Sequence, residues 1–139
     1  MAGLLTGPYR ASVLADSTEL AEFRRGFGAW LEECDIRSRA VAELLLAAHE
    51  AVAHAIRHSV PTGFIGVRGV LAGGEVTIDV TSKGGWGEPG HRADEQEQAL
   101  ILIRGLVDQL LISSDSSGTR LKMRRSLAPA TLRRVLDPA

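Results

Sequence analysis

The sequence predicts an α+β fold, a two-layer sandwich of a mixed, mostly antiparallel sheet with helices on one face. The predicted elements follow the order β-α-α-β-β-loop-α-β-β, and most neighbouring strands are joined by hairpins rather than by helices. A chain of 139 residues is long enough to bury one hydrophobic core. Because no internal repeat or linker divides it, we expect one domain over residues 1–139, with its core in residues 8–127.

The composition is that of a soluble globular protein, with 45% hydrophobic and 24% charged residues. The formal net charge of −1 argues against a general polyanion binder. No apolar run reaches the roughly 18–20 residues needed to cross a bilayer, and the N-terminus lacks the features of a secretion signal. We therefore expect a cytoplasmic protein with no membrane partner. The single cysteine, Cys34, excludes an intramolecular disulfide and is expected to be a small buried residue.

The first half predicts a strand and two helices. Residues Tyr9–Ala15 alternate as a strand does, and Asp16 or Ser17 can cap a helix that runs to Glu33. The strongest helix is Arg37–Ser59. Its apolar residues form one stripe, Val41, Leu44, Leu45, Ala48, Val52, Ala55 and Ile56. Its polar residues are predicted to lie on a different, solvated face.

The second half predicts two hairpins separated by a loop and a helix. The glycines of Ala72–Gly74 suit a tight turn between the first two strands. The loop, rich in Gly, Pro and charge, is expected to be a lid, a binding loop or disordered. The predicted elements are strands Phe64–Leu71 and Glu75–Ser82, loop Lys83–Gln96, helix Gln98–Gln109, strands Leu110–Ser113 and Thr119–Arg125 with turn Asp115–Gly118, and a final helical turn Leu132–Leu136.

Histidines on the strongest helix suggest a metal site at first sight. His49 and His54 are five residues apart, which separates them by about 140° around a helix, so they do not form a zinc-protease motif. His54 and His58 have the i,i+4 spacing, with Glu50 one turn before them, but a third ligand is not securely placed. A solvated polar helix face is the favoured interpretation.

Polar residues near the strand ends give weaker signals. Gly84–Gly87 lacks the spacing of a phosphate-binding Walker loop, and Ser82 has no His–Asp pair placed to activate it as a nucleophile. Arg120, Lys122 and Arg124 lie on one side of the last strand, where they form either a binding surface for an acidic partner or a solvated face.

Four segments together resemble a known family. Residues 46–55 read LAAHEAVAHA, residues 80–89 read VTSKGGWGEP, residues 97–106 read EQALILIRGL, and residues 118–125 read GTRLKMRR. Their order resembles the ATPase superfamily shared by DNA gyrase, histidine kinases and bacterial anti-sigma-factor serine kinases. It is most similar to the last group, in the short form common in high-GC Gram-positive bacteria, and implies a Bergerat-type ATPase fold.

The resemblance implies roles for the first two segments. Glu50 stands at the position of the general base that acts on the substrate serine. His54 stands where the family has the asparagine that holds the Mg²⁺ bridging the ATP phosphates. Ser82 replaces the aspartate that accepts a hydrogen bond from adenine, and Gly84 matches the glycine that follows it.

The last two segments complete the implied nucleotide site. Glu97 and Ala99 replace the glycines of the phosphate loop, Leu100 follows them, and Gly118 and Thr119 match the family's Gly-Thr. Imidazole suits Mg²⁺ poorly, and a Ser hydroxyl accepts a bond of about 1 kcal/mol where a carboxylate accepts about 2. Losses of about 1–3 kcal/mol at each of three positions weaken nucleotide binding by several orders of magnitude.

The resemblance leads to two main hypotheses. The first is a homodimeric regulator that binds a sigma factor or an anti-sigma-factor antagonist by occupancy, with weak or lost use of ATP and Mg²⁺. The alternative is an active ATP-dependent protein serine/threonine kinase that phosphorylates such an antagonist. Direct nucleic-acid binding through Arg120, Lys122, Arg124 and Arg125 is not expected, because no aromatic platform accompanies the charges.

Overall fold

The structure, a computed structural model, describes residues 7–59, 63–83 and 93–127. Its centre is a five-stranded sheet in the order β1-β2-β3-β5-β4. The strands are β1 (Tyr9–Leu14), β2 (Phe64–Ala72), β3 (Glu75–Ser82), β4 (Gln109–Asp115) and β5 (Gly118–Ser126). Every neighbouring pair of these strands is antiparallel, so the described sheet contains no parallel pair.

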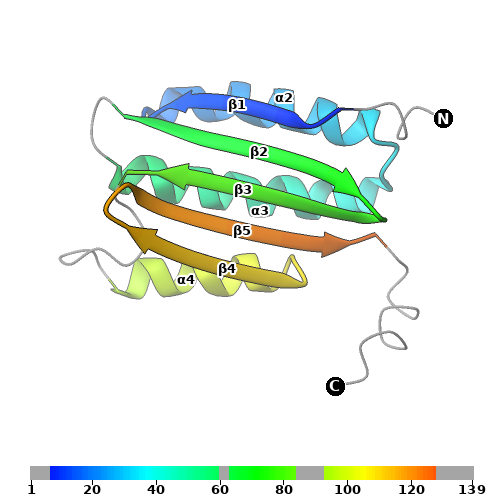
Figure 1. The fold of residues 1–139 in the computed structure, drawn as a ribbon. Helices are drawn as coiled ribbons and strands as arrows, with labels where there is room; N and C mark the ends of the chain where they lie inside the picture. Colours follow the sequence, from blue (N-terminus) through cyan, green and yellow to red (C-terminus); the bar gives the residue numbers. More distant parts are fainter. Residues whose placement is uncertain (1–6, 60–62, 84–92, 128–139) are drawn as a thin grey trace, which may run out of the picture.

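Three helices cover one face of this sheet and leave the other face open (Figure 1). They are α2 (Leu20–Glu33), α3 (Ser38–His58) and α4 (Ala93–Arg104), and a short 3₁₀ turn, η1 (Ser17–Glu19), precedes α2. The central helix is α3, which contacts α2, α4, β2 and β3. None of the described helices is long and apolar enough to span a membrane. The predicted α+β fold class is confirmed.

Alternation along the strands puts apolar side chains under the helices. In β3, Val76, Ile78 and Val80 are buried, while the residues between them lie on the opposite face. The predicted hairpin between β2 and β3 is also confirmed. Gly73 and Gly74 have φ values of 60° and 72°, the left-handed conformation that a two-residue turn of this kind requires.

Aromatic side chains fasten α2 to the first two strands. Tyr9 of β1 meets the ring of Phe27 edge-on, with ring centroids 5.1 Å apart. The indole N–H of Trp30 donates a hydrogen bond of 2.8 Å to the carbonyl of Gly7. The same indole lies over Gly69 of β2, where an added Cβ would be 2.9 Å from the ring. Glycine at this position therefore lets the helix approach the sheet closely.

The helix predicted over Gln98–Gln109 is displaced, because α4 begins and ends five residues earlier. Gly105 ends the helix, and its N–H bonds back to the carbonyl of Ile101 at 3.1 Å. The chain then becomes extended, and Gln109 is already part of β4. Residues 93–96, predicted to belong to the loop after β3, are helical, and residues 84–92 of that predicted lid or binding loop lie outside the described residues. The helical turn predicted at Leu132–Leu136 lies outside the described residues.

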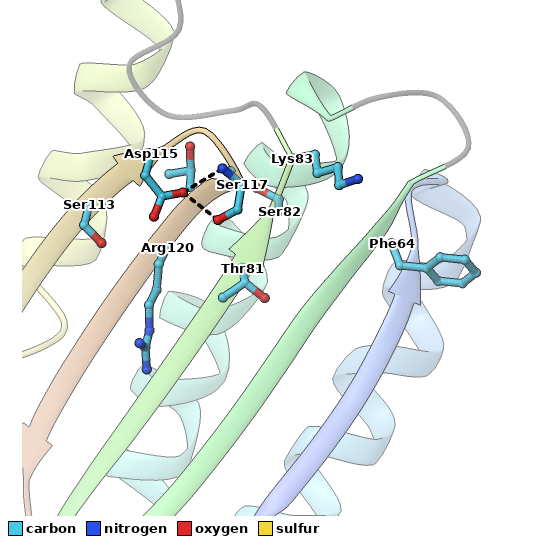
Figure 2. Close-up of a pocket in the computed structure, with 10 residues that line it drawn as sticks. Phe64, Thr81, Ser82, Lys83, Ser113, Asp115, Ser117 and Arg120 are labelled. Carbon is cyan, nitrogen blue, oxygen red and sulfur yellow. Dashed lines mark hydrogen bonds between the residues drawn. The ribbon is translucent and has the colours of Figure 1, made fainter.

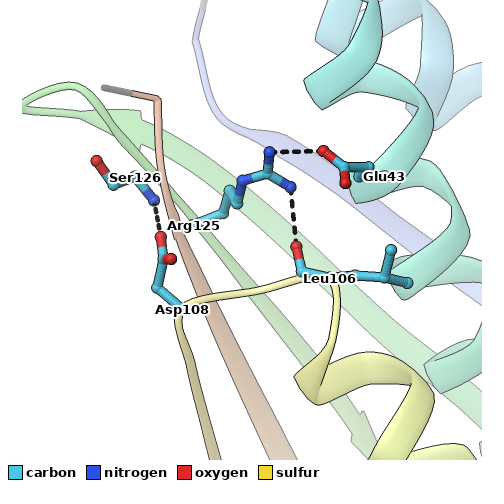
Figure 3. A network of polar contacts seen from close by, with 5 residues as sticks. All are labelled: Glu43, Leu106, Asp108, Arg125 and Ser126. Carbon is cyan, nitrogen blue, oxygen red and sulfur yellow. Dashed lines mark hydrogen bonds and ion pairs between the residues drawn. The ribbon is translucent and has the colours of Figure 1, made fainter. Parts of the chain in front are cut away.

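A polar network connects the two layers at one end of the molecule (Figure 3). Arg125 of β5 donates to Glu43 of α3 at 2.7 Å and to the carbonyl of Leu106, just after α4, at 2.8 Å. The backbone N–H of Ser126 donates to Asp108 at 2.6 Å. These contacts hold the end of α4 and the start of β4 against β5 and α3.

Candidate functional site

Glu50 occupies the middle of α3 and is half-buried. It lines a hollow of about 350 Å³ between α3 and α4, together with Arg57, Gln98, Ala99 and Leu102. Of the residues that the resemblance assigns to a nucleotide site, Glu50 and Ala99 are thus brought together here. A carboxylate beside an open volume can accept a proton or a hydrogen bond from a molecule that enters it.

His54 lies inside the protein, one turn after Glu50. Its side chain is fully buried, and its ring centroid lies 4.4 Å from that of His58. The prediction of a solvated polar face is therefore wrong for His54. The physical reason is the central place of α3: with α2 on one side, α4 on the other and the sheet beneath, every residue from Ala51 to Ala55 is buried.

Ser82, Gly118 and Thr119 meet where β3 ends and β5 begins. They line a hollow of about 440 Å³, and Phe64 and Arg120 also line it (Figure 2). Ser82 pairs directly with Thr119 across the two strands, and both are buried, as strand parity predicts for Ser82. Two small hydroxyl side chains therefore lie together at this end of the sheet.

The backbone of this hollow is shaped by its hairpin. Gly118 has φ 139°, and a Cβ at this position would collide with the carbonyl of Ser82. Asp115 accepts a hydrogen bond of 2.8 Å from the N–H of Ser117, which closes the turn between β4 and β5. The hydroxyl of Ser114 lies 3.2 Å from that of Thr119. Glycine at 118 is therefore needed for the close approach of β5 to the end of β3.

The residues that stand at the implied phosphate loop, Glu97, Ala99 and Leu100, lie within α4. Ala99 is buried, Leu100 is half-buried against the core, and both lie beyond the first turn of α4. Only the first four backbone N–H groups of a helix lack a partner within it, so the N–H groups of Ala99 and Leu100 are bonded inside α4. Glu97 is exposed on the same helix. Gly84 lies outside the described residues.

The donor groups near His54 do not fit the Mg²⁺ that the family resemblance implies. That ion prefers six oxygen ligands in octahedral geometry, whereas His54 offers a buried imidazole. No group of three or more His, Cys, Asp or Glu side chains among the described residues is placed to hold a metal ion. The described residues around His54 therefore do not fit a Mg²⁺ ion.

Burial also affects two groups that titrate. The pKa of His49 is lowered by burial and then by the charge of Arg24, so its imidazole resists protonation. Burial raises the pKa of the Cys34 thiol, and the nearby Glu33 carboxylate adds to the effect. Cys34 is buried, as predicted, and a raised pKa suits a packing role rather than a nucleophilic one.

Three residues of the hollow between α3 and α4, Arg57, Gln98 and Leu102, had no site role predicted from the sequence. Arg57 lies seven positions after Glu50, close to two helical turns, which predicts the same side of α3. This spacing is the sequence signal that places Arg57 beside Glu50. Gln98 lines the hollow from α4. Its role was missed because the predicted helix began at Gln98 itself, whereas α4 begins at Ala93.

Comparisons with known proteins place the fold. The family model for the histidine kinase-like ATPase domain matches residues 13–125. The chain is similar to the crystal structure of the RsbU and RsbW domains of Rv1364c from Mycobacterium tuberculosis, with 26% identity and a TM-score of 0.74. That match covers 90% of this chain and 34% of the other. No curated protein matches the sequence.

A second solved structure supports the fold alone. It is the blue-light activated histidine kinase EL346 from Erythrobacter litoralis, with 18% identity and a TM-score of 0.58. The match covers 70% of this chain and 34% of the other. The chain thus spans about a third of the length of each solved relative. The resemblance drawn from the four sequence segments is confirmed at the level of the ATPase family.

Proposed function

Because this chain belongs to the histidine kinase-like ATPase domain family, we propose that it is a regulator of the anti-sigma-factor type. It acts by binding a sigma factor or an anti-sigma-factor antagonist, and it uses ATP weakly or not at all. The observation that carries the proposal is the pattern of substitutions. The framework is intact, whereas His54, Ser82 and Ala99 replace residues at the positions implied to contact nucleotide.

The side chains at these positions are unfavourable for Mg-ATP. His54 is a fully buried imidazole, and Ser82 is a neutral hydroxyl where the family has a carboxylate. Glu97 adds a negative charge near the position proposed for the triphosphate, which is itself an anion. Three losses of about 1–3 kcal/mol each amount to several orders of magnitude in the dissociation constant.

The proposed mode of action is occupancy of a partner by a homodimer in the cytoplasm. Similarity to a structure that contains an RsbW domain supports a role in this regulatory class. In this mechanism the chain blocks a surface of its partner, and no chemical step is needed. Glu50 then contributes to the shape of the hollow between α3 and α4 and not to proton transfer.

A pull-down tests this mode of action. The tagged full chain is incubated with the sigma factors and small antagonist proteins of its own organism, with and without Mg-ATP. We expect one of them to be retained equally in both conditions and equally by the Glu50→Gln variant. Retention that requires ATP, or failure to retain any member of either class, contradicts the proposal.

The alternative is an active protein serine/threonine kinase. The observation in its favour is that Glu50 is kept and is half-buried beside an open volume of about 350 Å³, where a general base needs to be. Radiolabelled ATP and an antagonist protein distinguish the two functions. We expect no phosphoserine. A phosphoserine product that is lost in Glu50→Gln would establish the kinase instead.

A further inference from the structure

Basic side chains gather on the sheet face that the helices leave open. The strands place there Arg10 of β1, Arg68 of β2, and Arg120, Lys122 and Arg124 of β5. We call these five residues the cationic face. Three acidic residues share this side of the sheet: Asp79 lies in the middle of β3, while Glu75 and Asp115 lie at strand ends. Arg125 does not belong to the face, because it points toward α3 and pairs with Glu43.

The strand pairing leaves positive charges in excess at the centre of the cationic face. Arg10 pairs directly with Arg68, which pairs with Asp79, which pairs with Lys122. Like charges directly opposite each other destabilise a sheet. Asp79 accepts a hydrogen bond of 3.0 Å from Nε of Arg120. Within the part of the chain that the structure describes, no carboxylate lies within ion-pair distance of Arg10 or Arg68.

The same arginines surround a hollow in the open face. Its volume is about 400 Å³, and the residues that line it include Arg10, Gly66, Arg68, Asp79, Thr81 and Arg120. Gly66 keeps it open, because an added Cβ would lie 2.6 Å from Oγ1 of Thr81. Figure 2 shows Thr81 and Arg120 on this side of the sheet. Three guanidinium groups around one concave site offer several paired N–H donors, the arrangement that binds carboxylates in a bidentate manner.

We propose that the cationic face is a docking surface for an acidic segment of a partner protein, whose Asp or Glu side chains enter the hollow between Arg10, Arg68 and Arg120. The unfavourable Arg10–Arg68 pairing is relieved when a carboxylate lies between the two guanidinium groups. Exposed apolar side chains at the margin, Phe64 and Leu111, add contact area. Arginine and aromatic residues are enriched in protein interfaces.

Charge and composition favour a protein segment over other occupants. A second copy of the chain that docked through the same face would bring the same positive charges against it, which is repulsive. A nucleic acid needs stacking platforms or a broad basic surface, whereas Phe64 is the aromatic residue that the described strands place on this side and the whole chain has a net charge of −1. The surface lies on the opposite side of the sheet from Glu50 and His54, so the proposal does not depend on how the chain uses ATP.

Fluorescence anisotropy with a labelled peptide tests the proposal. The probe alternates Glu with Ser, so that an extended conformation presents carboxylates on one side. We expect it to bind the full chain, and we expect Arg10→Gln/Arg68→Gln to weaken binding about tenfold or more. The matched control is Arg25→Gln/Arg39→Gln, which removes two exposed arginines from the helical layer and changes affinity less than about twofold.

Three results would overturn the proposal. The first is an equal loss of affinity in both double variants, which indicates a general charge effect. The second is tighter binding of a single-stranded oligonucleotide of matched charge than of the peptide. The third is self-association, measured by sedimentation, that disappears in Arg10→Gln/Arg68→Gln. Thermal unfolding of each variant verifies the fold, and the face variant is expected to be at least as stable as the wild type, because it removes a like-charge pair.

Discussion

Among the described residues, His54 is the one whose surroundings bear most directly on nucleotide use. It is fully buried beside His58, and its position on α3 is the one from which the family resemblance expects an oxygen ligand for Mg²⁺. Ser82, at the end of β3, keeps hydrogen-bonding capacity without charge. Both side chains are buried, so each also packs within the fold at a position where the family resemblance implies a contact with nucleotide or Mg²⁺.

His49 gives a prediction about pH at the same scale. Because burial lowers its pKa below the ordinary value of 6.5, the unfolded chain binds the proton more readily than the folded chain. The free energy of unfolding therefore falls as the pH drops through about 6.5, and this contribution is fully present above about pH 7.5. Urea unfolding at about pH 7.5 and at pH values well below 6.5 measures this decrease. The decrease in the free energy of unfolding is expected to be smaller in His49→Gln. An unchanged decrease would show that other titrating groups cause it.

At the scale of elements, the sequence predicted buried side chains most reliably where apolar residues repeat with one regular spacing along a segment. Strict alternation in β3 and β5 predicted which side chains of each strand are buried, and the structure agrees. Helix α3 was harder, because a helical wheel assumes one buried stripe whereas α3 is covered on several sides. The boundary of α4 was missed because its continuous run of apolar residues begins only at Ala99, although the acidic residues before that run favour a helix start.

The contact between α2 and the sheet predicts the effect of one methyl group. In Gly69→Ala the new Cβ meets the rigid indole of Trp30 at 2.9 Å, so the helix or the ring must shift. We expect a loss of about 1–3 kcal/mol in the free energy of unfolding, measured with urea. Gly105→Ala is the matched control, because its Cβ meets its nearest atom at 3.5 Å. Equal effects of the two substitutions would contradict close packing at Gly69.

The polar network of Figure 3 predicts a second effect on stability. Arg125→Met leaves Glu43 and the carbonyl of Leu106 without their charged donor, and the Arg125 side chain is only 11% exposed. We expect a loss of about 1.5–3 kcal/mol. A double-mutant cycle with Glu43→Gln isolates the pair, and Arg104→Met, at an exposed position, serves as the control. Additive effects of Arg125→Met and Glu43→Gln would show that the pair contributes nothing.

For the whole molecule, the order of elements and four short segments were enough to predict the family, and the match over residues 13–125 agrees. The site was less accessible from sequence. Burial of His54 depends on helices from distant parts of the chain, and the hollow in the cationic face is formed by four strands, β1, β2, β3 and β5. Such features arise from tertiary packing, which local periodicity does not encode.

The central claim is that this ATPase fold has lost effective nucleotide binding. Isothermal titration calorimetry of the full chain with ATP and Mg²⁺ tests it most directly, with His54→Asn/Ser82→Asp as the variant that restores the family's ligand types. We predict for the wild type a dissociation constant weaker than about 0.1 mM, or no detectable heat, and at least about tenfold tighter binding for the folded variant. Low-micromolar binding by the wild type would contradict the claim.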